Sequence, residues 1–159
     1  MQKFALLIVS IFVISACTPI ASPTEFPGVD KQSLEAEIRT VVESFGARLQ
    51  MVSLLAPDAA GQIEQQYIEF LAPELLQGWM ADPASAPGRL TSSPWPDRIE
   101  INEVQLQGPD QYLVTGVIIE VTSTEQMNGG VAALYPAQIT LSNVGGNWLI
   151  TTWQPGEYQ

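Results

Sequence analysis

The chain of 159 residues has no histidine, one cysteine and only six lysine or arginine residues, against seventeen aspartate or glutamate residues. Without histidine, the most frequent general base near neutral pH is missing, and the Ser-His-Asp and Cys-His arrangements are excluded. A single cysteine excludes an intramolecular disulfide and a metal site built from several thiolates. The sequence also lacks a Gly-rich phosphate loop and EF-hand spacing, so it predicts no metal site and no cofactor.

The scarcity of basic residues limits the possible partners. Lys3 lies in an N-terminal apolar segment, so five basic residues face all seventeen acidic ones over the rest of the chain. Such a surface is repelled by phosphate backbones and by anionic lipid headgroups. We therefore expect no nucleic-acid partner, and no basic face that would hold the protein on a membrane.

The N-terminal segment combines Lys3, an apolar stretch over residues 4–14 and the tetrad Ile14-Ser15-Ala16-Cys17. A charged start, about ten apolar residues and small residues at a cleavage site are typical of a secretory signal peptide, whereas a spanning helix needs roughly 20 apolar residues. The tetrad resembles the lipobox of bacterial lipoproteins. This resemblance implies that residues 1–16 are removed, that Cys17 carries a diacylglyceryl group, and that the protein is extracytoplasmic and anchored to the membrane by lipid.

The rest of the chain reads as a tether followed by one domain. Residues 18–29 contain three prolines and no apolar period, which disfavours a helix or a central strand. We interpret residues 17–30 as the lipidated cysteine and a semi-extended tether. Residues 31–154 are then expected to form one domain, and residues 155–159 a short tail.

The first half of this domain has the apolar spacing of helices. Apolar residues recur at intervals of three and four from the predicted N-cap Asp30 to near Leu55, which indicates one long helix. Asp58 is expected to cap a second helix that stops at Pro73. Pro73 is tolerated in a first helical turn, and it begins a third helix that reaches Met80.

After a proline-rich loop over residues 84–96, the apolar period becomes two. Four antiparallel strands are predicted, over residues 99–106, 112–124, 137–144 and 148–153. A slip of the apolar phase suggests a bulge in the first strand, the second is rich in branched residues and expected to be central, and Gly145-Gly146-Asn147 indicates a hairpin turn. Helices followed by antiparallel strands predict an α+β fold, with the helices packed on one face of a curved sheet.

Two segments resemble the NTF2-like superfamily. Residues 67–76 are similar to the second-helix region of such domains, and residues 146–150 to their final strand, where a Gly-x-Trp-hydrophobic pattern recurs. The resemblance covers roughly residues 31–154. It implies a cone whose antiparallel sheet, of four or more strands, wraps around a long first helix. A cystatin-like fold, with one helix against an antiparallel sheet, is the structural alternative.

The resemblance also directs the search for a pocket. Some NTF2-like enzymes, such as ketosteroid isomerases and polyketide cyclases, use an Asp base and a Tyr donor within the cone. In this chain Tyr67, Asp97, Tyr112 and Glu120 are candidates for such a place, although no local motif matches those enzymes. A buried carboxylate at Glu120 would have a raised pKa and act as an acid or base, whereas a carboxylate at the open strand end would not.

The four tryptophans are the other candidates. Trp148 and Trp153 are expected to fill the core. Trp79 and Trp95 flank the long loop, and each either fills the core or offers a stacking surface to a sugar or a flat apolar ligand. Prolines on both sides of Trp95 favour an extended backbone there. Trp95 could then lie over the mouth of the cone, serve as an anchor for a partner, or seal the open end of the core. The candidate pocket or partner surface thus comprises Trp79, Trp95, Asp97, Tyr112 and Glu120.

Together these patterns favour a non-catalytic, lipid-anchored protein of the cell envelope, whose domain binds a small apolar ligand or another envelope protein. The alternative is a small isomerase-like or cyclase-like enzyme that uses Asp or Glu with Tyr inside the cone. A third hypothesis is an accessory subunit of a secretion, conjugation or wall-building complex.

Replacement of Cys17 by serine tests the N-terminal interpretation. The Cys17→Ser variant should lose labelled palmitate and leave the membrane fraction, because the thioether cannot form and two acyl chains are what hold such a protein firmly. Metabolic labelling and cell fractionation measure the two effects, with Ser15→Ala as a control that keeps a small side chain beside the cleavage site. A Cys17→Ser protein that matures normally and stays with the membrane would contradict the interpretation.

Overall fold

A computed structural model describes residues 30–157. The expectations for residues 1–29, including the modification of Cys17, lie outside the described residues. The elements in chain order are α1 (Lys31–Gly46), the 3-10 helix η1 (Leu49–Met51), α2 (Ala59–Tyr67), α3 (Pro73–Ala81), the 3-10 helix η2 (Pro83–Ser85), β1 (Trp95–Gly108), β2 (Gln111–Val121), α4 (Ser123–Asn128), β3 (Ala133–Val144) and β4 (Asn147–Pro155). Within residues 30–157, every helix is too short or too polar to cross a bilayer.

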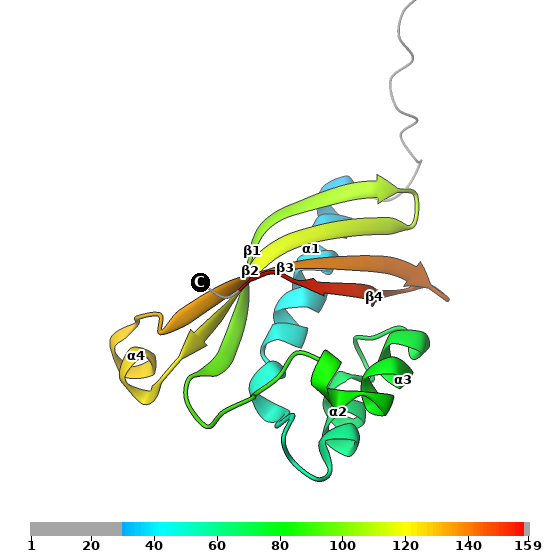
Figure 1. The fold of residues 1–159 in the computed structure, drawn as a ribbon. Helices are drawn as coiled ribbons and strands as arrows, with labels where there is room; N and C mark the ends of the chain where they lie inside the picture. Colours follow the sequence, from blue (N-terminus) through cyan, green and yellow to red (C-terminus); the bar gives the residue numbers. More distant parts are fainter. Residues whose placement is uncertain (1–29, 158–159) are drawn as a thin grey trace, which may run out of the picture.

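The four strands form one antiparallel sheet in the order β1-β2-β3-β4. Alternate residues of β2, among them Val114 and Ile118, are fully buried on the face that α1 covers. Figure 1 shows the curved sheet with α1 across it and with α2 and α3 beside β4. The predicted α+β fold, with helices on a curved four-stranded antiparallel sheet, is therefore confirmed. The central place of β2 and the bulge of β1, between Ile101 and Glu103, are confirmed as well.

The first helix begins as predicted but ends earlier. The Asp30 carboxylate accepts a hydrogen bond from the N–H of Gln32 (3.2 Å), as an N-cap should. The expected end near Leu55 is wrong, because the chain leaves the helix after Gly46, where the backbone packs so closely that a Cβ would lie 2.8 Å from the nitrogen of Ile99. Six residues later, the Val52 carbonyl accepts from the N–H of Arg89, outside any helix.

The expected end of the second helix at Pro73 is wrong, because α2 ends at Tyr67. Three predicted strand boundaries and one predicted cap are also corrected. β1 begins at Trp95, inside the expected loop, because residues 95–96 already pair with the end of β2. β2 ends at Val121, since Thr122 and Glu125 form a capping box that starts α4, a helix the strand pattern had concealed. β3 begins at Ala133, four residues early. Asp58 precedes α2, but its carboxylate accepts from the side chain of Gln62 (3.0 Å) instead of the backbone.

The core holds a cluster of five aromatic rings that joins the helices to the sheet. Phe45 of α1 lies at its centre, with ring centroids 4.9 Å from Tyr67 of α2, 6.4 Å from Trp79 of α3 and 5.7 Å from Trp153 of β4. Phe70, between α2 and α3, is the fifth member, 6.0 Å from Phe45. These contacts fix the α2–α3 pair against the end of α1.

Replacing a glycine by alanine at two positions tests how closely β1 and β2 pack. A Cβ on Gly116 of β2 would lie 2.7 Å from the carbonyl oxygen of Glu100 in β1, whereas a Cβ on Gly78 of α3 would meet no atom within 4 Å. Gly116→Ala should therefore lower the free energy of unfolding by about 1–3 kcal/mol. Gly78→Ala should raise it by about 0.5–1 kcal/mol, since alanine favours the helix. Urea denaturation measures both, and equal effects would contradict this account.

Candidate functional site

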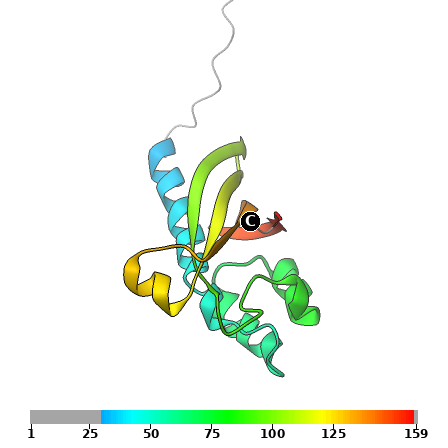
Figure 2. The same cartoon turned by 60° about the vertical axis from the view of Figure 1, so that its left-hand side comes forward.

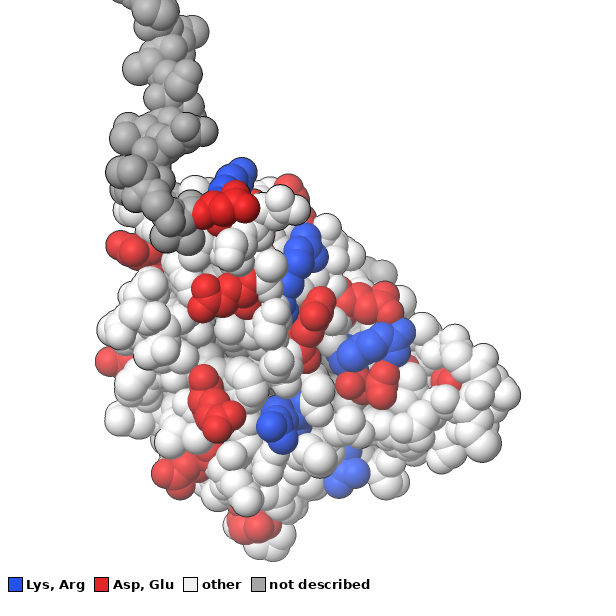
Figure 3. All heavy atoms as spheres, turned by 180° about the vertical axis from the view of Figure 1, so that it is seen from behind, with Lys and Arg blue, Asp and Glu red and all other residues white. Residues whose placement is uncertain are grey.

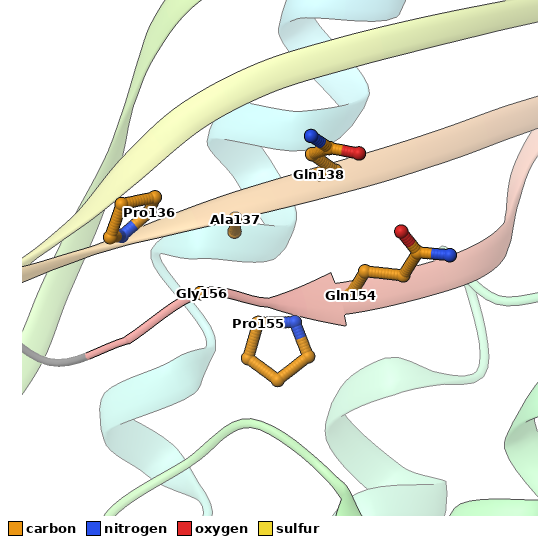
Figure 4. A pocket seen from close by; sticks show the side chains of 6 residues that line it. All are labelled: Pro136, Ala137, Gln138, Gln154, Pro155 and Gly156. Atoms are coloured by element: carbon orange, nitrogen blue, oxygen red, sulfur yellow. The ribbon is translucent and has the colours of Figure 1, made fainter.

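The described residues form at least two surface hollows. The first, of about 190 Å³, lies between the end of β4 and the facing part of β3 (Figure 4), and its lining residues are Pro136, Ala137, Gln138, Gln154, Pro155 and Gly156. Gln138 and Gln154 are opposite each other on the two strands, and the Gly156 N–H donates to the Pro136 carbonyl (2.7 Å). This lining has no ionisable side chain.

The second hollow is larger, about 320 Å³, and we call it the Arg89 hollow. Its lining residues are Gln50, Arg89, Ser92, Trp95 and Gln126. They come from η1, from the loop that precedes β1, from the start of β1 and from α4. Arg89 and Trp95 are half-buried there, while Ser92 and Gln126 are exposed. Among the two hollows, this one alone contains a charged group.

The loop that presents Arg89 is held by backbone and side-chain hydrogen bonds. The N–H of Arg89 donates to the Val52 carbonyl (2.8 Å), and its own carbonyl accepts from the N–H of Leu54 (2.9 Å). The buried Tyr67 hydroxyl donates to the Pro87 carbonyl (2.8 Å). Between them, Gly88 packs so closely that a Cβ would lie 3.0 Å from the Val52 oxygen. Arg89 thus projects from a fixed backbone.

The opposite walls are also anchored. Trp95 is the first residue of β1 and is paired with Val121 of β2, so its backbone belongs to the sheet. Gln126 lies in α4, which starts at a capping box in which the N–H of Thr122 donates to the Glu125 carboxylate (3.1 Å). A hydrogen bond from the Thr122 hydroxyl, together with backbone N–H donors, lowers the pKa of Glu125. The hollow is therefore bounded by three separately fixed segments.

Arg89 itself has an unusual environment. Its Nε atom is shielded from solvent and has no hydrogen-bond partner within residues 30–157. The ion pairs among these residues join Lys31 to Glu35 and Arg98 to Asp97 and Glu100, and Arg89 is in none of them. Buried polar nitrogen atoms nearly always have partners in folded proteins. Arg89 is thus a half-buried cation without an acidic partner within residues 30–157.

Exposed apolar side chains lie next to the hollow in the chain. Eight large apolar residues among those described are exposed, and three of them directly follow a lining residue. We call these three, Met51, Leu90 and Met127, the apolar rim; their exposed fractions are 57%, 59% and 80%. Because each of the three adjoins a lining residue in the chain, its backbone lies near the hollow. Elsewhere the charges are mixed, and Figure 3 shows acidic and basic side chains intermingled over one face.

The structure separates the five candidate residues predicted from the sequence. Trp95 lines the Arg89 hollow. Trp79 lies in the aromatic core (4% exposed), and Tyr112 is buried against Trp148, with ring centroids 5.3 Å apart. Glu120 is half-buried near the end of β2. Asp97 pairs with Arg98 (2.8 Å). Neither hollow is lined by Asp97, Tyr112 or Glu120.

The sequence analysis did not identify Arg89, Gln50, Ser92 or Gln126. No local motif connects them, because they are brought together only by folding. The one available signal was that Arg89 is among the few basic residues and lies in the Pro-Gly loop directly before the Trp95 segment.

Comparison with known proteins gives distant structural similarities. No family model matches the chain, and no curated protein matches it. One solved structure, described as an Ntf2 like protein involved in plasmid conjugation, is 16% identical with a TM-score of 0.44 over 92% of this chain. The chain spans 50% of the length of that structure. Another, the intermembrane space region of the chloroplast protein ARC6, is 12% identical with a TM-score of 0.42, covering 82% of this chain and 98% of that one.

The Tyr67 hydroxyl connects the aromatic core to the loop that carries Arg89. Its contribution to the free energy of unfolding can be measured near neutral pH and at alkaline pH. Tyr67→Phe should lower the free energy of unfolding at pH 7 by about 1–3 kcal/mol, because it leaves the buried Pro87 carbonyl without its donor. Tyr112→Phe is the matched control, since the Tyr112 hydroxyl makes no hydrogen bond within residues 30–157. Its change should stay within about 0.5 kcal/mol.

Burial, and next the Coulombic influence of Tyr135, raises the pKa of Tyr67 above its ordinary value of 10.0. The unfolded chain therefore releases the phenolic proton at a lower pH than the folded chain. The contribution of this group to stability is fully present below pH 10 and is lost as the pH rises beyond it. Unfolding measured between pH 8 and about pH 11 should show a shallower alkaline decline for Tyr67→Phe than for the parent, and equal slopes would contradict the burial of this hydroxyl.

Proposed function

We propose that this chain is a non-catalytic, lipid-anchored protein of the cell envelope whose folded domain is a binding module. In this proposal the N-terminal segment directs export, a diacylglyceryl group on Cys17 holds the protein to the membrane, and the Arg89 hollow contacts the ligand or partner. One observation carries the proposal: Arg89, a half-buried cation outside every ion pair of residues 30–157, and the half-buried Trp95 line the same hollow.

The lining chemistry of the hollow supports binding more than catalysis. Its five side chains include no carboxylate, thiol or imidazole, the groups that most often act as general acids and bases. The Ser92 hydroxyl accordingly has no general base beside it in the lining. Arginine and tryptophan, by contrast, are the residues most enriched at binding hot spots, because they bury a large surface and keep directed polar atoms.

The position of the hollow also suits a tethered protein. The helix α1 has 16 residues and is therefore about 24 Å long. Its first turn lies at one end of the domain, whereas η1, which follows its last turn, and α4 lie at the other (Figures 1 and 2). A domain held through its N-terminus would thus present the Arg89 hollow away from its anchor, where a partner can reach it.

Site-specific crosslinking in the native host tests the binding role. The photoreactive residue p-benzoylphenylalanine replaces Leu90 of the apolar rim in one variant, and Leu106 near the end of β1 in the control; both positions are exposed, by 59% and 47%. Illumination should give a discrete adduct from position 90 and none from position 106, and mass spectrometry identifies the captured species. Adding Trp95→Ala should abolish the adduct, because a central aromatic anchor dominates such contacts.

Two results would contradict the proposal. Equal capture from positions 90 and 106 would mean that contacts are not concentrated at the hollow. The absence of any adduct at position 90, in cells where the protein is folded and fractionates with membranes, would mean that the hollow has no partner there.

A further inference from the structure

The sheet has a second face, which points away from α1. The residues of β2 and β3 that alternate with fully buried ones such as Val114 and Ile139 are paired with each other, as Thr115 is with Gln138. Residues directly opposite each other in a sheet point to the same side. We call this side the outer face; it comprises residues 113, 115, 117 and 119 of β2, residues 134, 136, 138, 140 and 142 of β3, and residues 149, 151 and 154 of β4.

The outer face is partly open and carries no charge. Apart from residue 119, its residues are half-buried or exposed, and none of them is Asp, Glu, Lys or Arg. Charged side chains begin at its margin in β1, where Glu100 is opposite Val117 and Glu103 is opposite Thr115. A solvated sheet face is usually polar, whereas an uncharged centre with a polar margin is the composition of a protein interface.

The chemistry of the outer face is complementary to itself. Leu113, Val117 and Leu149 provide aliphatic groups, and Thr115 lies between the first two on β2, opposite the amide of Gln138. Hydroxyl and amide groups both donate and accept hydrogen bonds. Two copies of this face can therefore bury aliphatic side chains against each other and still satisfy the polar groups between them.

The net charge of the chain favours a second copy as the occupant of this face. Two copies with a formal net charge of −11 each repel each other wherever their acidic surfaces meet. Contact through the outer faces keeps the acidic groups at the margin, where water and salt screen them. A basic partner, by contrast, would be attracted to the acidic surfaces of the domain and not to its uncharged face.

The size of the sheet is sufficient for such a contact. Its four strands have between 9 and 14 residues. With about 4.8 Å between strands and about 3.3 Å per residue, four strands of about ten residues cover about 600 Å². Two such faces in contact bury about 1,200 Å², which is the lower limit of specific, stable interfaces. We therefore expect a reversible dimer of modest affinity.

We infer that two copies of this chain associate through their outer faces in a symmetric dimer, with Gln138 inside the contact and Glu100 at its margin. A two-fold axis closes this assembly at two copies, because the same face is used by both. Pro136, Gln138 and Gln154 of the outer face also line the first hollow, which offers a recess to a side chain of the other copy. The Arg89 hollow shares no lining residue with the outer face, so each copy keeps that hollow free.

Sedimentation equilibrium of the full-length chain in density-matched detergent measures the association directly. Density matching leaves the mass of the protein as the only contribution. The apparent mass should rise with concentration from that of one copy to that of two, with a Kd of about 100 μM or tighter. A mass that continued to rise beyond two copies would contradict the closed two-fold contact.

Two isosteric substitutions show whether the outer face makes the contact. Gln138 of β3 and Gln65 of α2 are both exposed, and replacement by glutamate adds one negative charge at either position. Gln138→Glu should weaken the dimer at least about tenfold, because it places a like charge from each copy in the contact, whereas Gln65→Glu should leave the Kd unchanged. Melting curves at a concentration where the parent is monomeric confirm that both variants are folded.

Mixing two variants distinguishes a contact from a general effect on the sheet. Gln138→Lys alone should also weaken the dimer, since it too places like charges together. An equimolar mixture of Gln138→Lys and Gln138→Glu should associate more strongly than either variant alone, because opposite charges then meet across the contact.

Three outcomes would overturn the inference. The first is a parent chain that remains monomeric at every concentration up to about 1 mM. The second is an equal effect of Gln138→Glu and Gln65→Glu on the Kd. The third is a mixture of the two position-138 variants that associates no more strongly than each variant by itself.

Discussion

The contact of Phe45 with four other aromatic rings is the interaction on which the rest of the described structure depends. This one side chain, in the last turn of α1, touches Tyr67, Phe70, Trp79 and Trp153, and so joins α2 and α3 to the end of α1 and to β4. Aromatic pairs at such distances, of which those with Tyr67 and Trp153 are edge-to-face, add about 0.5–1.5 kcal/mol each beyond their buried area. The short helices α2 and α3, of nine residues each, are too short to be stable alone and take their position from this cluster.

The same cluster determines where the candidate site lies. Tyr67 packs its ring against Phe45 and uses its hydroxyl to hold the Pro87 carbonyl. Pro87 is followed by Gly88, which packs closely against Val52, and then by Arg89. A continuous set of contacts therefore runs from the middle of the core to the guanidinium, and the arginine is presented by packed backbone even though it belongs to a segment without regular structure.

The sequence predicted the parts of the fold that depend on local spacing, and it failed where distant segments compete. Alternation identified the four strands, and Gly145 and Gly146 marked the hairpin, where both adopt positive φ angles of 63° and 91°. The early end of α1 could not be predicted, because it depends on Ile99 packing against Gly46, from a strand more than fifty residues away. The sequence could not distinguish Trp79 from Trp95 as candidates. Only tertiary packing places Trp79 in the core and Trp95 in the wall of the hollow. Arg89 had no motif at all.

Arg89 forms no ion pair within residues 30–157. This is informative because the chain contains many acidic residues that could pair with it. Seventeen acidic residues are available, and Arg98, nine residues along, contacts two carboxylates, those of Asp97 and Glu100. A single acidic side chain at the position of Gln50, Ser92 or Gln126 would place a carboxylate in the wall that Arg89 shares, yet all three positions carry neutral donors. Sequences depart from local satisfaction chiefly at functional sites, where stability is given up for binding. Under the proposed function, the partner of this unpaired guanidinium comes from outside the chain.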